Sequence, residues 1–222
     1  PLPASARPAA GTDAHLTVWQ PATNELWEFW KLRRENGAWH TMWGGAIRNA
    51  TASPGYFTTN SWPGAQPYWG ATATSLPLVG GLIRLDDLRQ GHIDHALALG
   101  IPQTRSGVYT SPAERTDGTV ASTAAVPEGA RFRLDPHLDL SRLGLPPFVL
   151  MLAQAAQAHG VVVRDTAGAV TFYGEDPRPS SPNPYTSLIG PSYDNGSLFS
   201  LLARFPWNHL QLLQMQLHTA HH

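Results

Sequence analysis

The sequence predicts a mainly β fold, a β-sandwich or jelly roll with one central helix near residues 146–159 and helices at the C-terminus. Many short stretches suited to strands are separated by turn-forming residues. Only one segment has the composition and boundaries of a long helix. The 222 residues suit a single globular domain with tails. We expect a disordered leader over 1–12, a β-sandwich domain over 13–176, and a loop with a C-terminal helical extension over 177–222, packed on that domain.

Residues 14–32 read as a β-hairpin, because two alternating segments flank the turn sequence Pro-Ala-Thr-Asn. With the turn centred on residues 22 and 23, one face is wholly apolar and should be core. That face carries Leu16, Val18, Trp27 and Phe29. The other face mixes aromatic rings with a histidine and an acid, as binding faces do, and carries His15, Thr17, Trp19, Leu26, Glu28 and Trp30.

A short strand near 37–45 leads into a Gly-, Pro- and Trp-rich loop to about residue 70, and loops of that length are usually functional. A helical turn over 86–90 should end at Gly91, with a strand following over 92–99. Proline opens the helix over 146–159 and Gly160 closes it. The remaining expected elements are strands at 108–110, 130–134, 161–163 and 169–173 and helices near 198–204 and 207–217.

Composition excludes several classes of function. The formal net charge is -1 and the chain has one lysine, which argues against a nucleic-acid partner. The absence of cysteine excludes disulfides, zinc–thiolate sites and iron–sulfur clusters. No apolar run reaches the ~18 residues of a membrane span. Charged residues make up only 14% of the chain, so a neutral polysaccharide or oligosaccharide is the expected partner. The Pro- and Ala-rich start resembles a mature terminus after signal-peptide removal, which indicates a secreted, extracellular protein.

Four titratable side chains are the candidate catalytic residues. Glu28 lies among tryptophans, where burial raises a carboxyl pKa as a general acid requires. His95 is expected as a base or orienting residue, and Asp94 or Asp165 as a second carboxylate, since glycosidases use two. The alternatives are a structural role for Glu28, a core role for His95 and a turn role for Asp165. His15, Glu28 and His95 could also form a two-histidine, one-carboxylate metal set, although no metal or cofactor belongs to the main hypothesis.

Aromatic residues supply the candidate binding surface. Six of the eight tryptophans lie between residues 19 and 62, and aromatic rings stack well on the C–H faces of sugars. The expected substrate-binding residues are His15, Trp19, Trp30, Trp62, Trp69 and Tyr109.

The segments Leu-Pro-Leu-Val-Gly-Gly-Leu-Ile-Arg-Leu-Asp-Asp at 76–87 and Gly-His-Ile-Asp-His-Ala-Leu at 91–97 resemble a family of secreted bacterial and fungal proteins without an assigned activity. The likeness extends over most of residues 13–176, through 109–113, 131–134 and 160–165. At Tyr109 the family would have a tryptophan. The resemblance implies an extracellular, jelly-roll-like protein, often found near polysaccharide-degrading functions.

The sequence therefore predicts a secreted glycan-active enzyme, a polysaccharide hydrolase or lyase with acid and base residues in an aromatic-lined cleft. The main alternative is a non-catalytic carbohydrate-binding protein. A metal-dependent enzyme and a structural or adhesion protein of the cell envelope are further alternatives.

Overall fold

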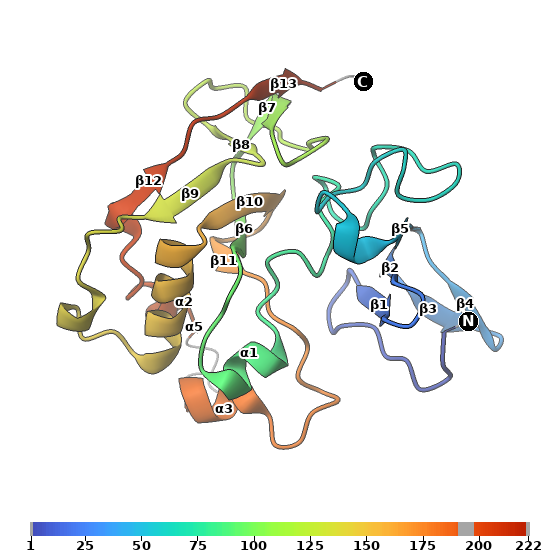
Figure 1. Ribbon diagram of the computed structural model, residues 1–222, viewed down its shortest axis with the longest axis horizontal. Helices are drawn as coiled ribbons and strands as arrows, with labels where there is room; N and C mark the ends of the chain where they lie inside the picture. Colours follow the sequence, from blue (N-terminus) through green and yellow to red (C-terminus); the bar gives the residue numbers. More distant parts are fainter. Residues whose placement is uncertain (1, 191–197, 221–222) are drawn as a thin grey trace.

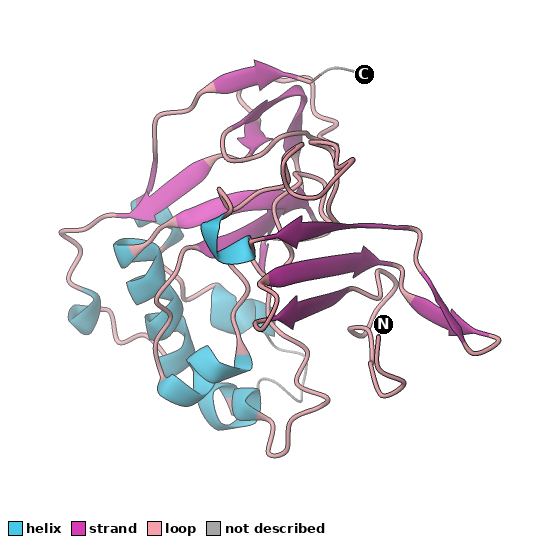
Figure 2. Ribbon diagram, turned by 45° about the vertical axis from the view of Figure 1, so that its right-hand side comes forward, coloured by secondary structure: helices cyan, strands magenta, loops and turns pink. Residues whose placement is uncertain are grey.

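The computed structural model describes residues 2–190 and 198–220, and its fold is mainly β with a few short helices. Its strands form four sheets, and most of the helices gather on one side of the molecule (Figure 2). The prediction of a mainly β protein is confirmed. The finer assignment, a sandwich or jelly roll, stays a prediction. No helix in the described part of the chain is long and apolar enough to cross a membrane.

The N-terminal sheet contains β1 (Leu16–Gln20), β2 (Glu25–Trp30) and β5 (Trp43–Arg48), all antiparallel. The ribbon of β3 (Arg33–Glu35) and β4 (Ala38–His40) links β2 to β5. The predicted hairpin is confirmed. Its register is also as expected, with Thr17 opposite Glu28 and Trp19 opposite Leu26.

The assignment of the two hairpin faces was wrong. Leu26 and Glu28 are buried, and Leu26 packs with Ile47 and Phe57 in a small core. Trp27, on the face expected to be core, is only partly buried. The period of two decides which residues share a face, but the rest of the chain decides which face is covered. Here the loop after β5 supplies that cover.

A second sheet has the order β11 (Thr171–Phe172), β6 (Leu97–Ile101), β10 (Val161–Thr166), β9 (Arg131–Leu134) and β12 (Leu210–Leu212). β6 and β10 are parallel, and the other pairs are antiparallel. Helix α2 (Pro147–Ala158) contacts β9 and β6, and the main core lies between them (Figure 1). α2 matches the predicted helix.

The third sheet contains β13 (Leu217–Thr219), β7 (Thr104–Thr110) and β8 (Val126–Glu128). The remaining helices are short: α1 (Leu85–Gln90), α3 (Pro184–Ile189), α5 (Leu198–Leu202) and the 3₁₀ turns η1 (Ala50–Ala52), η2 (Leu140–Arg142) and η3 (Trp207–His209). α1 ends at Gly91 in the left-handed conformation, as predicted.

Three expected elements differ from the structure. The single strand expected near 37–45 is divided between β4 and β5, which belong to different sheets. The strand expected over 92–99 begins only at Leu97, and residues 92–96 form an irregular connection after α1. The helix expected over 207–217 is a 3₁₀ turn followed by β12, because the exposed edge of β9 offers hydrogen bonds to this segment. The predicted disordered leader is bonded to the body: Arg178 donates to the Pro8 carbonyl, and the Ala10 N–H donates to Asp176.

Candidate active site

A polar cavity of about 690 Å³ lies where the N-terminal sheet faces the end of β10 and the turn into β11. The loop at residues 70–73 forms one wall, and Arg115 and Asp117, which follow β7, form another. The residues around the cavity are Asp13, His15, Trp30, Met42, Trp43, Gly70, Ala71, Thr72, Ala73, Arg115, Asp117, Asp165, Thr166, Ala167, Gly168, Thr171 and Tyr173.

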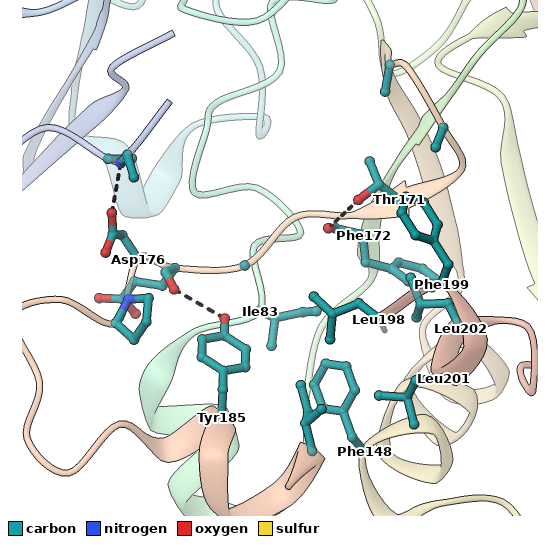
Figure 3. Close-up of a pocket in the computed structure, with 18 of the residues that line it drawn as sticks. Ile83, Phe148, Thr171, Phe172, Asp176, Tyr185, Leu198, Phe199, Leu201 and Leu202 are labelled. Atoms are coloured by element: carbon teal, nitrogen blue, oxygen red, sulfur yellow. Dashed lines mark hydrogen bonds between the residues drawn. The ribbon is translucent and has the colours of Figure 1, made fainter. Parts of the chain in front are cut away.

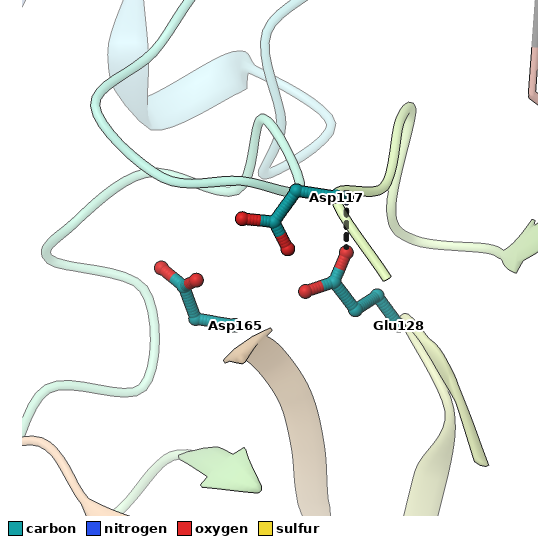
Figure 4. Close-up of side chains that lie close together, drawn as sticks. All are labelled: Asp117, Glu128 and Asp165. Atoms are coloured by element: carbon teal, nitrogen blue, oxygen red, sulfur yellow. Dashed lines mark hydrogen bonds between the residues drawn. The ribbon is translucent and has the colours of Figure 1, made fainter. Parts of the chain in front are cut away.

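Three carboxyl groups from distant parts of the chain converge beside this cavity. Oxygen atoms of Asp117, Glu128 and Asp165 all lie within 4.8 Å of one another, and Figure 4 shows the three groups facing a common centre. Glu128 ends β8 and Asp165 lies in β10. The Asp117 N–H donates to Glu128 Oε2 at 3.1 Å, which links two of the three segments.

Burial and mutual repulsion raise the pKa of two of these acids. Burial raises the pKa of Asp165 to about 6, and the nearby Asp117 carboxylate adds to the shift. Burial, together with the Asp117 charge, holds the pKa of Glu128 well above its usual range. Glu128 is fully buried and does not line the cavity, whereas Asp165 lines it and Asp117 is exposed. The site therefore places a carboxyl group that exchanges protons near neutrality beside a second, solvated carboxyl group.

Two buried nitrogen atoms of residues around the cavity have no hydrogen-bond partner among the described residues. Arg115 donates through Nη2 to the Thr72 carbonyl at 2.6 Å, but its Nε is buried without a partner among the described residues. The same is true of His15 Nε2. Burial lowers the pKa of His15, so the neutral imidazole is favoured.

Aromatic side chains complete the walls. The Trp30 indole donates to Asp13 Oδ1 at 3.0 Å, which fixes the orientation of its ring. The Arg164 guanidinium lies 3.9 Å from the Tyr173 ring centroid. Burial raises the pKa of Tyr173 to about 12, so its hydroxyl remains a hydrogen-bond donor.

Glu28 lies behind the cavity wall and does not open into it. Its side chain is 0% exposed, and its two oxygens accept the N–H groups of Ala71 and Leu78, each at 2.6 Å. Burial raises its pKa to about 7. Glu28 thus fixes both ends of the segment 71–78 by hydrogen bonds. Residues 71–73 of this segment form a wall of the cavity.

His95 and Asp94, expected beside Glu28, lie in the connection between α1 and β6. His95 Nε2 is 3.2 Å from Asp87 Oδ2, and Asp94 forms an exposed ion pair with His92. Neither residue lines the polar cavity. The structure corrects the expected shared cleft, since the hairpin and β6 belong to different sheets.

Some of the predicted binding residues line the cavity and the others lie elsewhere. His15 and Trp30 line the cavity together with Asp165. Trp62 packs against Trp27 and Arg48, and Trp69 against the small core. Elsewhere, Trp19 is exposed on β1, and Tyr109 stacks on His218.

Sequence reasoning missed Asp117, Glu128, Arg115 and Tyr173. Asp117 precedes a glycine in a polar loop, which indicates only a turn. Glu128 follows Val-Pro in a three-residue strand, so no local pattern indicates that it is buried. Their proximity depends on the pairing of β7 with β8 and on the contact of β8 with β10, which the sequence does not reveal.

A second cavity, of about 900 Å³, lies among the helices (Figure 3). Its walls are mainly apolar and include Ile83, Phe148, Phe172 and Leu202. The ion pair of Asp176 with Arg178 satisfies the charges at one end. Because an acid with a raised pKa lies at the wall of the polar cavity, it is the better candidate active site.

No protein-family model, curated protein or solved structure matches this chain.

Proposed function

We propose that the protein is a glycoside hydrolase acting on a neutral polysaccharide or oligosaccharide, with the polar cavity as its active site. The observation that carries the proposal is the convergence of Asp117 and Asp165 in a cavity walled by tryptophan. Glycosidases typically need two carboxyl groups on either side of the scissile bond, one of them protonated. The pKa of Asp165 suits the protonated role.

In this proposal Asp165 donates its proton to the glycosidic oxygen as the C–O bond breaks. Asp117 attacks the anomeric carbon and forms a glycosyl ester. Water then hydrolyses the ester, with Asp165 taking the proton back. Spacing favours this two-step route. One oxygen of Asp117 and one of Asp165 lie within 4.8 Å of each other. Carboxyl groups about 5–5.5 Å apart are typical of retaining enzymes, whereas inverting enzymes need ~6.5–9.5 Å.

The charges around the cavity favour a neutral sugar. Asp13, Asp117 and Asp165 line it with a single arginine, Arg115. A uronic acid would meet this acidic wall at a cost in electrostatic energy. Lyases eliminate beside a uronate carboxylate, so hydrolysis is the better fit. An extracellular location belongs to the same proposal.

The experiment measures reducing-end release from a panel of soluble neutral polysaccharides. Wild-type protein should cleave at least one of them, and Asp165→Asn and Asp117→Asn should each lower kcat by at least a hundredfold. Asp94→Asn is the matched control, because Asp94 is an exposed acid outside the cavity. Equal rates for Asp165→Asn and Asp94→Asn would remove Asp165 from the mechanism.

A metal-dependent enzyme is the second candidate, because Asp117, Glu128 and Asp165 can offer three oxygen ligands to one cation. Carboxylate oxygens suit Ca²⁺, Mg²⁺ or Mn²⁺. This candidate predicts that EDTA abolishes activity and that Ca²⁺ or Mn²⁺ raises the Tm of wild-type protein but not of Glu128→Gln. Activity unchanged by EDTA would favour the two-carboxyl mechanism.

A further inference from the structure

Two aromatic side chains stack at the rim of the polar cavity. Trp43 begins β5, directly opposite Trp30 on β2, and it lines the cavity. Tyr68 comes from the long loop and stacks on Trp43, with ring centroids 6.1 Å apart and planes inclined by 23°. We call Trp43 and Tyr68 the aromatic shelf.

The aromatic shelf is open to solvent. Trp43 is 40% exposed and Tyr68 is 48% exposed, although large aromatic rings are usually mostly buried. Two apolar rings held together at a cavity mouth indicate an interaction surface. Their mutual stacking restricts both rings before any ligand arrives, so binding costs less conformational entropy.

We infer that the aromatic shelf binds a sugar unit next to the unit held in the cavity, so that the substrate has at least two linked sugar units and polymers bind through the shelf. This inference rests on the proposed function. Trp30, Trp43 and Tyr68 form a continuous series, in which Trp30 and Trp43 line the cavity and Tyr68 extends beyond it. A single sugar would fill only the cavity, whereas an adjoining unit brings its C–H face onto the shelf.

The test is native affinity electrophoresis in gels containing hydroxyethylcellulose, xylan, glucomannan or laminarin. It uses the Asp165→Asn background, so that binding is read without cleavage. At least one polymer should retard the parent protein. Adding Trp43→Ala or Tyr68→Ala should raise its dissociation constant about tenfold, and Trp43→Phe should restore most of the retardation.

Trp19→Ala is the matched control, because Trp19 is 44% exposed but lies outside the cavity. It should leave retardation unchanged. Two variants are used because one of them could fold poorly. Tyr68 lies in a loop and Trp43 begins a strand, so the two substitutions affect different parts of the fold. Retardation by none of the polymers, or equal retardation of Tyr68→Ala and Trp19→Ala, would overturn the inference.

The protein could instead self-associate, and Tyr68→Ala could abolish this self-association. That result would also overturn the inference and assign the shelf to contact between copies of this chain. The binding result is separate from the proposed activity. If retardation depends on the shelf but the protein cleaves no glycan, the proposed hydrolase activity is wrong. The inference that the shelf binds glycans would still hold.

Discussion

At the scale of single residues, Asp165 and Glu28 show that two acids whose pKa is raised by the same effect can have different roles. Burial raises the pKa of both acids, to about 6 and about 7. Asp165 lines the cavity and can exchange a proton with a substrate. Glu28 is enclosed, and its hydrogen bonds to two backbone N–H groups give it a structural role.

The pKa of Asp165 predicts the pH dependence of cleavage. A general acid works only while protonated, so kcat should fall as the pH rises through about 6, by about tenfold per pH unit beyond it. A pH–rate profile on the best polysaccharide tests this. Asp94→Asn should keep the same profile, and a kcat that stays constant up to pH 8 would contradict the assignment.

Glu28 should make the protein less stable as the pH rises. The unfolded side chain loses its proton near pH 4.5 and the folded one near 7, so the folded state holds the proton more tightly. The free energy of unfolding should therefore fall by about 3 kcal/mol between these pH values and level off above them.

Urea denaturation of wild type, Glu28→Gln and Glu35→Gln from pH 4 to 8 tests the role of Glu28. Burial also raises the pKa of Asp165 and Glu128, so Glu28→Gln should remove about 3 kcal/mol of this fall and leave the part that those two acids cause. Glu35→Gln, at an exposed ion pair, should leave the whole fall unchanged. The same pH dependence in all three proteins would show that Glu28 does not cause it.

At the scale of elements, the segment from Gly70 to Gly80 connects the cavity wall to both main sheets. Glu28 of β2 accepts hydrogen bonds from Ala71 and Leu78, and Arg164 of β10 donates to the Leu78 carbonyl at 2.7 Å. Two buried ionisable side chains thus hold an irregular segment in place, which explains how a loop can form part of a defined site.

Gly70 is where this segment tolerates least change. Its φ is +104°, and an added Cβ would lie 2.7 Å from the Phe57 ring and 3.1 Å from Glu28 Oε1. Gly64 has a similar φ of +85° but open space around it. Gly64→Ala should cost about 1 kcal/mol of stability from backbone strain, and Gly70→Ala roughly 1–3 kcal/mol more from crowding. Urea denaturation of both variants measures the difference, and equal losses would show that packing at Gly70 is not tight.

At the scale of the whole molecule, local patterns predicted local structure. The hairpin, its register, α1 with its glycine end, and α2 follow from turn residues, capping and composition within a few positions. The buried face of the hairpin and the end of the chain depend on what other segments cover or pair with, so sequence patterns alone did not determine them.

The site was predicted only in part, for the same reason. His15, Trp30 and Asp165 were identified by residue type and lie around one cavity. Asp117 and Glu128 meet Asp165 only through the arrangement of β8 and β10, which are more than thirty positions apart in the chain. Glu28 had the expected raised pKa, but the sequence did not show that its carboxyl group is sealed from solvent.

The central claim is that the Asp117 and Asp165 carboxyl groups cleave a glycosidic bond between them. Proton NMR of the first product, recorded before mutarotation, tests it most directly by reporting the anomeric configuration. Wild-type protein should give a product that retains the configuration of the substrate, and Asp165→Asn should give none. An inverted product, or no product from any neutral polysaccharide, would contradict it.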